Sequence, residues 1–183
     1  MHTAQKVIAT GLGSAALALG MLSPAQAEVT RINDGADSAA TLNDVLTVRL
    51  AHTTTKVRVR TTYQDLRKTA DDGGASSSIF LDTKPARPGP EYVLLAGLQL
   101  GTDYQLVRVK DWKPTGEPKT CAHDFAVDFA KDVTRLVVSR PCLGNPKRVR
   151  VSQRVTDMAD ASHPVRDWAP ARREFSAWVR PGK

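Results

Sequence analysis

The chain contains 183 residues, of which 41% are hydrophobic and 25% charged, and its formal net charge is +7. This length suits a single domain with a sizeable core. The basic excess suits anionic partners such as cell-envelope polymers, or simply a soluble surface. Aromatic residues make up only 5% of the chain, so the stacking platforms of a single-strand nucleic-acid binder are not expected.

The first part of the chain has the organisation of a secretory signal peptide. Lys6 precedes an apolar stretch from Val7 to Leu22, and Ala25-Gln26-Ala27 provides a small-residue cleavage site. The alternative, an uncleaved membrane anchor, needs about 20 strongly apolar residues. We therefore expect a signal peptide over residues 1–27 and a secreted, extracellular single domain over residues 28–183, with no membrane span. Loss of Lys6 lowers the net charge from +7 to +6.

Alternation of apolar and polar residues predicts short strands in the next part of the chain. Leu46–Leu50 and Val57–Arg60 show this pattern, and the polar run His52–Lys56 between them predicts a hairpin connection. The following Asp-Asp-Gly-Gly and serine run, with Ser76–Ser78, predicts a loop. Further strands are expected at 78–82, 91–97 and 102–109, separated by segments rich in proline and glycine.

The only two cysteines, Cys121 and Cys142, flank a segment with the pattern of a β-hairpin. If residues whose numbers sum to 263 face each other, Cys121 lies opposite Cys142 and Phe125 lies opposite Val138. A one-residue slip would bring the apolar face of one strand against the mixed face of the other. Two cysteines in an oxidising compartment usually pair. We therefore predict a disulfide; a metal site would need further ligands at suitable spacing.

The C-terminal part is expected to complete the fold. Alternation resumes around Val149 and Val151, with arginines on the other face. Thr156–Pro170 is expected to form a loop, followed by a last strand at Arg173–Val179. Eight or nine short strands predict an all-β fold, a single antiparallel, jelly-roll-like β-sandwich with one disulfide.

Several segments of the chain resemble a group of small secreted actinobacterial proteins of unknown function, over roughly residues 40–180. They are LDTKPARPGPEYVL, GTDYQLVRVKDW, the paired C…RPCLGNPKRVRVSQRV and DWAPARREFSAWV. The first segment, with the later CLGNP, is also distantly similar to the β-sandwich modules of the DOMON and family 9 carbohydrate-binding type. That resemblance implies a sandwich that often holds calcium or binds sugars. Asp82 matches the first aspartate of its motif and Glu91 a later one, but Lys84 replaces the second and cannot ligate calcium.

Calcium is the one cofactor for which the sequence offers candidate ligands. Asp82, Glu91 and Asp103 carry the oxygen atoms that this ion prefers. Exposed aromatic side chains would support glycan binding. The candidate ligand-binding residues are Asp82, Glu91, Tyr92, Tyr104, Trp112 and Trp168.

No catalytic residue is assigned from the sequence. His52, His123 and His163 are expected in solvent or at the rim of the sandwich, and no G-x-S-x-G motif occurs. We expect a non-catalytic binding protein whose partner is a glycan or another anionic envelope polymer rather than nucleic acid. Two alternatives stay open: a secreted hydrolase with a carboxylate- or histidine-based site, and a structural or inhibitory protein-interaction domain.

Overall fold

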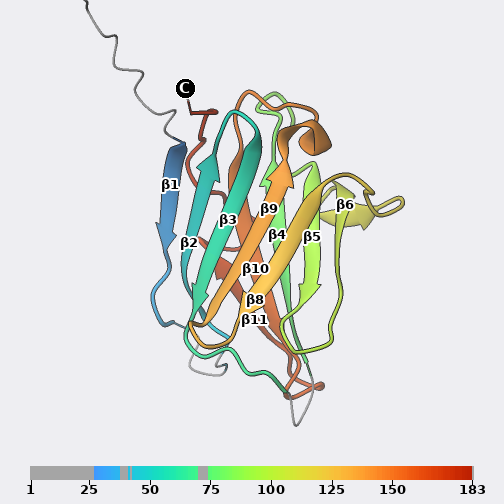
Figure 1. Ribbon diagram of the computed structural model, residues 1–183. Helices are drawn as coiled ribbons and strands as arrows, with labels where there is room; N and C mark the ends of the chain where they lie inside the picture. The colour runs from blue at the N-terminus through green and yellow to red at the C-terminus, as the bar shows by residue number, and fades with distance from the viewer. Residues whose placement is uncertain (1–26, 38–40, 42, 70–73, 183) are drawn as a thin grey trace, which may run out of the picture.

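The fold is a sandwich of two antiparallel β-sheets, as predicted (Figure 1). A computed structural model describes residues 27–37, 41, 43–69 and 74–182, so the expected signal peptide lies outside the described residues except for Ala27. The described residues form eleven strands rather than eight or nine. They contain no helix long and apolar enough to cross a membrane.

Five strands form sheet A and six form sheet B. Sheet A has the order β1-β2-β3-β9-β8. Its strands are β1 (Glu28–Asn33), β2 (Val45–His52), β3 (Lys56–Tyr63), β8 (His123–Asp128) and β9 (Val133–Ser139). Sheet B has the order β11-β10-β4-β5-β6-β7. Its strands are β4 (Ala75–Asp82), β5 (Tyr92–Gly97), β6 (Tyr104–Lys110), β7 (Lys113–Thr115), β10 (Arg150–Asp157) and β11 (Val165–Ala169).

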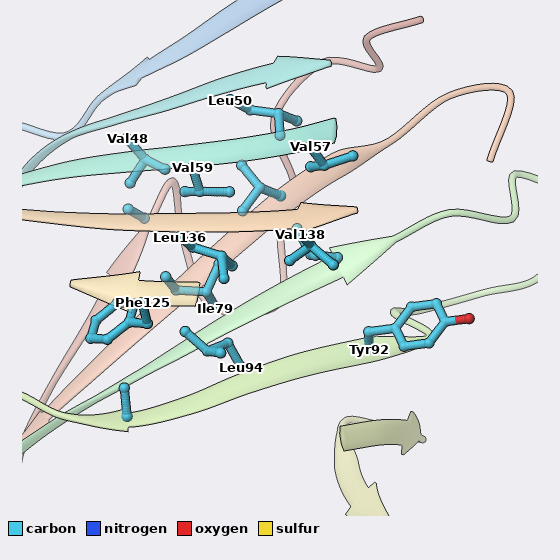
Figure 2. Close-up of a cluster of buried hydrophobic side chains, with 14 of the residues drawn as sticks. Val48, Leu50, Val57, Val59, Ile79, Tyr92, Leu94, Phe125, Leu136 and Val138 are labelled. Carbon is cyan, nitrogen blue, oxygen red and sulfur yellow. The ribbon is translucent and has the colours of Figure 1, made fainter. Parts of the chain in front are cut away.

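Apolar side chains from alternate positions fill the space between the sheets. Figure 2 shows Val57, Val59 and Leu136 of sheet A facing Ile79 and Leu94 of sheet B, and all five are almost fully buried. Burial of aliphatic and aromatic surface supplies about 25 cal/mol per Å² of apolar area removed from water. The inward positions therefore account for the pairing of the two sheets, and Val57 and Val59 are inward as expected from the alternation.

A buried polar network also joins the two sheets. Gln153 of β10 donates from Nε2 to the Tyr63 hydroxyl at 2.8 Å and to Ser77 Oγ at 3.0 Å. Its Oε1 accepts a hydrogen bond from Thr61 at 2.6 Å, and Tyr63 also contacts Thr134 Oγ1 at 3.2 Å. Thr61, Tyr63 and Thr134 belong to sheet A, whereas Ser77 and Gln153 belong to sheet B. These hydrogen bonds offset the cost of burying polar groups in an apolar core.

The predicted disulfide between Cys121 and Cys142 is present, with the two Cα atoms 5.5 Å apart. The predicted register of its hairpin is wrong by two residues, because paired positions of β8 and β9 sum to 261: Phe125 faces Leu136 rather than Val138. A two-residue shift keeps every side chain on its own face, so hydrophobicity does not distinguish the two registers. Cys142 lies in a short 3-10 turn, Arg140–Leu143, that follows β9 and brings its sulfur back to Cys121.

Three further expectations about local structure are wrong. Ser76–Ser78 belong to β4 rather than to a loop, and Ser77 and Ser78 are buried. A strand, β11, lies inside the expected loop Thr156–Pro170, whereas Arg173–Val179 contributes only an isolated bridge from Val179 to Val149. His52, expected in a solvent-facing connection, ends β2 with none of its surface exposed. The C-terminal segment covers it: His52 Nδ1 lies 3.3 Å from the Val179 carbonyl.

Candidate functional site

The outer face of sheet B carries an aromatic cluster where β4, β10 and β11 lie side by side. Alternation that points Ile79 and Leu81 inward turns Phe80 of β4 outward. Trp168 of β11 stacks on Phe80 with their ring centroids 5.9 Å apart and their planes 10° apart. The strand order places β10 between β4 and β11, so these two rings lie across β10 from one another.

The turn between β6 and β7 adds a second indole to this cluster. Asp111 and Trp112 have positive φ values of 52° and 64°, a conformation that reverses the chain within two residues. The Trp112 ring centroid lies 5.0 Å from that of Phe80 and 5.8 Å from that of Trp168, both edge-on. Trp112 and Trp168 are both half-buried, so each ring also keeps an accessible surface.

Arginines surround these rings and form a hollow of about 580 Å³. Three of them, Arg166, Arg172 and Arg173, are exposed, whereas Arg154 is half-buried. No carboxylate lines the hollow, and none of the four guanidinium groups forms an ion pair with another described residue. The residues that line it are Phe80, Trp112, Arg154, Arg166, Trp168, Arg172 and Arg173. We call this hollow the arginine–tryptophan pocket.

Arg154 shows the electrostatic character of the pocket most clearly. Its guanidinium lies 5.6 Å from the centroid of the Trp168 ring, and one of its nitrogens donates to Ser78 Oγ at 3.2 Å. Burial lowers the pKa of Arg154 from its usual value, and the positive charge of Arg166 lowers it further. Its buried Nε atom has no hydrogen-bond partner among the described residues. An anion in the hollow would relieve the repulsion between the guanidinium groups of Arg154 and Arg166.

A second hollow of about 730 Å³ adjoins the pocket, and Arg154 lines both. Its wall is mostly uncharged: Ser76, Ser78 and Gln105 supply polar groups, and Tyr104 adds a ring. Hydroxyl and amide groups of this kind can exchange hydrogen bonds with a hydroxyl-rich ligand. The two hollows together form a groove on sheet B, cationic at one end and mostly uncharged at the other, where Asp103 is the one acidic lining residue.

The structure divides the ligand-binding residues predicted from the sequence into three groups. Trp112 and Trp168 line the arginine–tryptophan pocket, and Tyr104 lines the adjoining hollow together with Asp103. Tyr92 belongs to the buried core cluster and is only 5% exposed, so it does not contribute a surface for a ligand. Asp82 and Glu91 line neither hollow. The arginines of the pocket could not be singled out from the sequence, because most arginines are only solvated side chains.

The carboxylate of Asp82 is held by an arginine. Asp82 is fully buried, and its Oδ2 accepts from Arg150 Nη2 at 2.6 Å and from Nε at 2.8 Å. Glu91 accepts hydrogen bonds from the backbone and hydroxyl of Thr83, at 2.8 and 3.0 Å. Among the described residues, Asp82, Glu91 and Asp103 do not bring their oxygens together as a cation site requires. The guanidinium already occupies the position beside Asp82 that calcium would need.

Acidic oxygens converge instead between β1, β2 and β11. Asp37, Asp44 and Asp167 each place a carboxylate oxygen within 4.8 Å of the others. Burial raises the pKa of the nearby Asp34 to about 7, and the charges of Asp167, Asp37 and Asp44 add to the effect. Burial likewise raises the pKa of Asp167 to about 6, although the Val45 N–H, 2.7 Å from its Oδ2, acts in the other direction. If the protein holds a divalent cation, this set of oxygen ligands is the better match.

Two other groupings contain residues with metal-binding or catalytic chemistry. Cys121, Cys142 and His123 lie close together, but both sulfur atoms are committed to the disulfide and cannot ligate a metal as thiolates. Asp160, Ser162 and His163 lie within one exposed turn. Ser162 Oγ and Asp160 Oδ2 both contact Nδ1 of His163, at 2.9 and 3.0 Å. A catalytic triad needs the acid and the nucleophile on opposite ring nitrogens, so this turn is not one.

Comparisons with models of protein families, with curated proteins and with solved structures found no match to the chain. The sandwich and the groove on sheet B therefore have to be interpreted from their own residues.

Proposed function

We propose that the chain is a secreted, non-catalytic binding protein that holds an anionic glycan in the groove on sheet B. The observation that carries this proposal is the arginine–tryptophan pocket, where four guanidinium groups surround two indoles without a carboxylate. Arginine forks suit the planar carboxylate, sulfate or phosphate group of an acidic sugar. The indole faces suit the apolar face of a sugar ring. The serine-lined hollow suits the hydroxyl groups of uncharged sugar units next to the acidic one.

Secretion and binding to the cell envelope complete the proposal. The residues before Glu28 have the composition of a signal peptide, and the disulfide is typical of proteins from oxidising compartments. Mass spectrometry of the protein from culture fluid should give an N-terminus at Glu28. Recovery of the whole chain from the cytoplasm would contradict this part of the proposal.

Glycan binding can be tested by retention on an insoluble polyuronate and on its methyl ester, which has the same backbone without the charge. We expect retention on the polyuronate only, and at least a tenfold loss for Arg166→Glu/Arg172→Glu. A matched control is Arg67→Glu/Lys68→Glu, which makes the same charge change at exposed residues outside the groove. Equal losses for the two double variants, or no retention of the wild type on any acidic polysaccharide, would refute the proposal.

A further inference from the structure

The outer face of sheet A, on the other side of the sandwich from the groove, carries a straight row of arginines. In the pairing of β1, β2, β3 and β9, Arg31 lies opposite Arg49, Arg49 opposite Arg60, and Arg60 opposite Arg135. All four side chains are exposed. We call them the arginine row. Because strands lie about 4.8 Å apart, the row runs about 14 Å across the sheet, at right angles to the strands.

Little on this face neutralises the row. Arg135 forms one ion pair, with Asp128 at 3.6 Å, and Arg60 donates to Thr62 Oγ1 at 3.2 Å. Arg31 and Arg49 form no ion pair with any residue that the structure describes. Like charges directly opposite each other destabilise a sheet. Three consecutive like-charged pairs are therefore a local cost to folding, which a bound polyanion would remove.

The surface between these side chains is shallow and contains no aromatic ring. A small hollow of about 150 Å³ lies among Arg49, Arg58, Arg60 and Arg135, with Val137 at its floor. A single-stranded nucleic acid would need rings on which to stack its bases. A membrane surface would need a larger apolar face to insert. A flat, cationic and ring-free strip instead fits a linear polymer whose charges lie outside its backbone.

We propose that the arginine row is a second binding surface, for a linear anionic polysaccharide that lies across the strands of sheet A. A chain with an anionic group about every 5 Å would meet one guanidinium on each of four successive strands. This proposal rests on the register of sheet A alone and does not depend on the groove on sheet B. If both proposals hold, one molecule carries two glycan sites on opposite outer faces.

The test measures the affinity for long heparin chains, a linear sulfated polysaccharide, at several salt concentrations. The variant Arg49→Gln/Arg60→Gln removes the two central charges of the row. We expect its affinity to fall at least tenfold, and the slope of log Kd against log salt to fall by about two, because two fewer counterions are released. Its midpoint of thermal unfolding should be unchanged or higher, since two exposed like charges are removed. A lower midpoint would contradict the claim that repulsion within the arginine row destabilises sheet A.

The matched control, Arg166→Gln/Arg172→Gln, removes the same charge from the groove on sheet B. It should weaken binding to long heparin less than the row variant does, and it should impair retention on the polyuronate more than the row variant does. Equal affinity of the row variant and the wild type for heparin would overturn the proposal. Row-dependent binding that is as tight to duplex DNA, or to vesicles containing phosphatidylserine, would overturn the assignment to a polysaccharide.

Discussion

Replacement of Gln153 by leucine tests how much the buried polar network contributes to the joining of the two sheets. Leucine has a similar size, so the change creates little cavity, but it removes the hydrogen bonds to Thr61, Tyr63 and Ser77. Tyr63 keeps its contact with Thr134, whereas Thr61 and Ser77 lose the partner that Gln153 provides. A buried hydroxyl without a partner costs about 1–3 kcal/mol, so two of them lower the free energy of unfolding by about 2–6 kcal/mol.

Urea denaturation followed by tryptophan fluorescence measures this change. Gln64→Leu, at an exposed glutamine just after β3, is the matched control and should change the free energy of unfolding by less than about 0.5 kcal/mol. Tyr63→Phe should cost less in the Gln153→Leu protein than in the wild type, because part of its hydrogen bonding is already lost. A Gln153→Leu protein as stable as the wild type would refute the claim that the network stabilises the sandwich.

Three further predictions concern pH and the disulfide. The pKa of Asp34 rises from 3.8 to about 7 in the folded protein, so the folded state holds this proton more tightly than the unfolded chain. The contribution of Asp34 to stability is thus present below about pH 4 and lost as the pH rises to 7. Asp34→Asn should flatten this decline in the midpoint of thermal unfolding. A variant with the same pH profile as the wild type would contradict the prediction. Burial lowers the pKa of His52 from 6.5, so His52 opposes folding as the pH falls below 6.5. His52→Leu should remove this acid-side loss from the unfolding free energy measured between pH 7 and pH 5. Cys121→Ser/Cys142→Ser should lower the free energy of unfolding by about 3 kcal/mol, as loop-closure entropy predicts for a separation of 21 residues. A loss below about 1 kcal/mol would show that the disulfide barely constrains the unfolded chain.

The sandwich could be predicted from the sequence because its inward residues alternate with polar ones. This pattern identified the faces of β2, β3, β9 and β10. It could not give the register of the cysteine hairpin, since a two-residue shift changes no face. A four-residue connection between Asp128 and Val133, with Asp132 at a φ of 53°, sets that register instead.

The serine strand and the groove could not be predicted for different reasons. Serine is typical of turns, and the inward Ser77 fits β4 only because Gln153 of the neighbouring strand β10 provides its hydrogen-bond partner. The pocket arginines come from three separate segments, and only the pairing of β11 with β10 brings Arg166 to Arg154. The acidic residues show the same difficulty, since Asp167 joins Asp44 across more than a hundred positions of the chain.

The start of β1 and the last described residues lie at one corner of the sandwich. The backbone amide of Arg180 donates to the Glu28 carboxylate, and that of Gly182 donates to the carbonyl of His52 at 3.0 Å. A short linker can therefore join Glu28 to Gly182 without crossing either charged face. The strand order is thus compatible with a circularly permuted chain whose new ends lie in the exposed proline-rich connection between β4 and β5. An affinity tag can then be placed at this connection while the core residues stay the same.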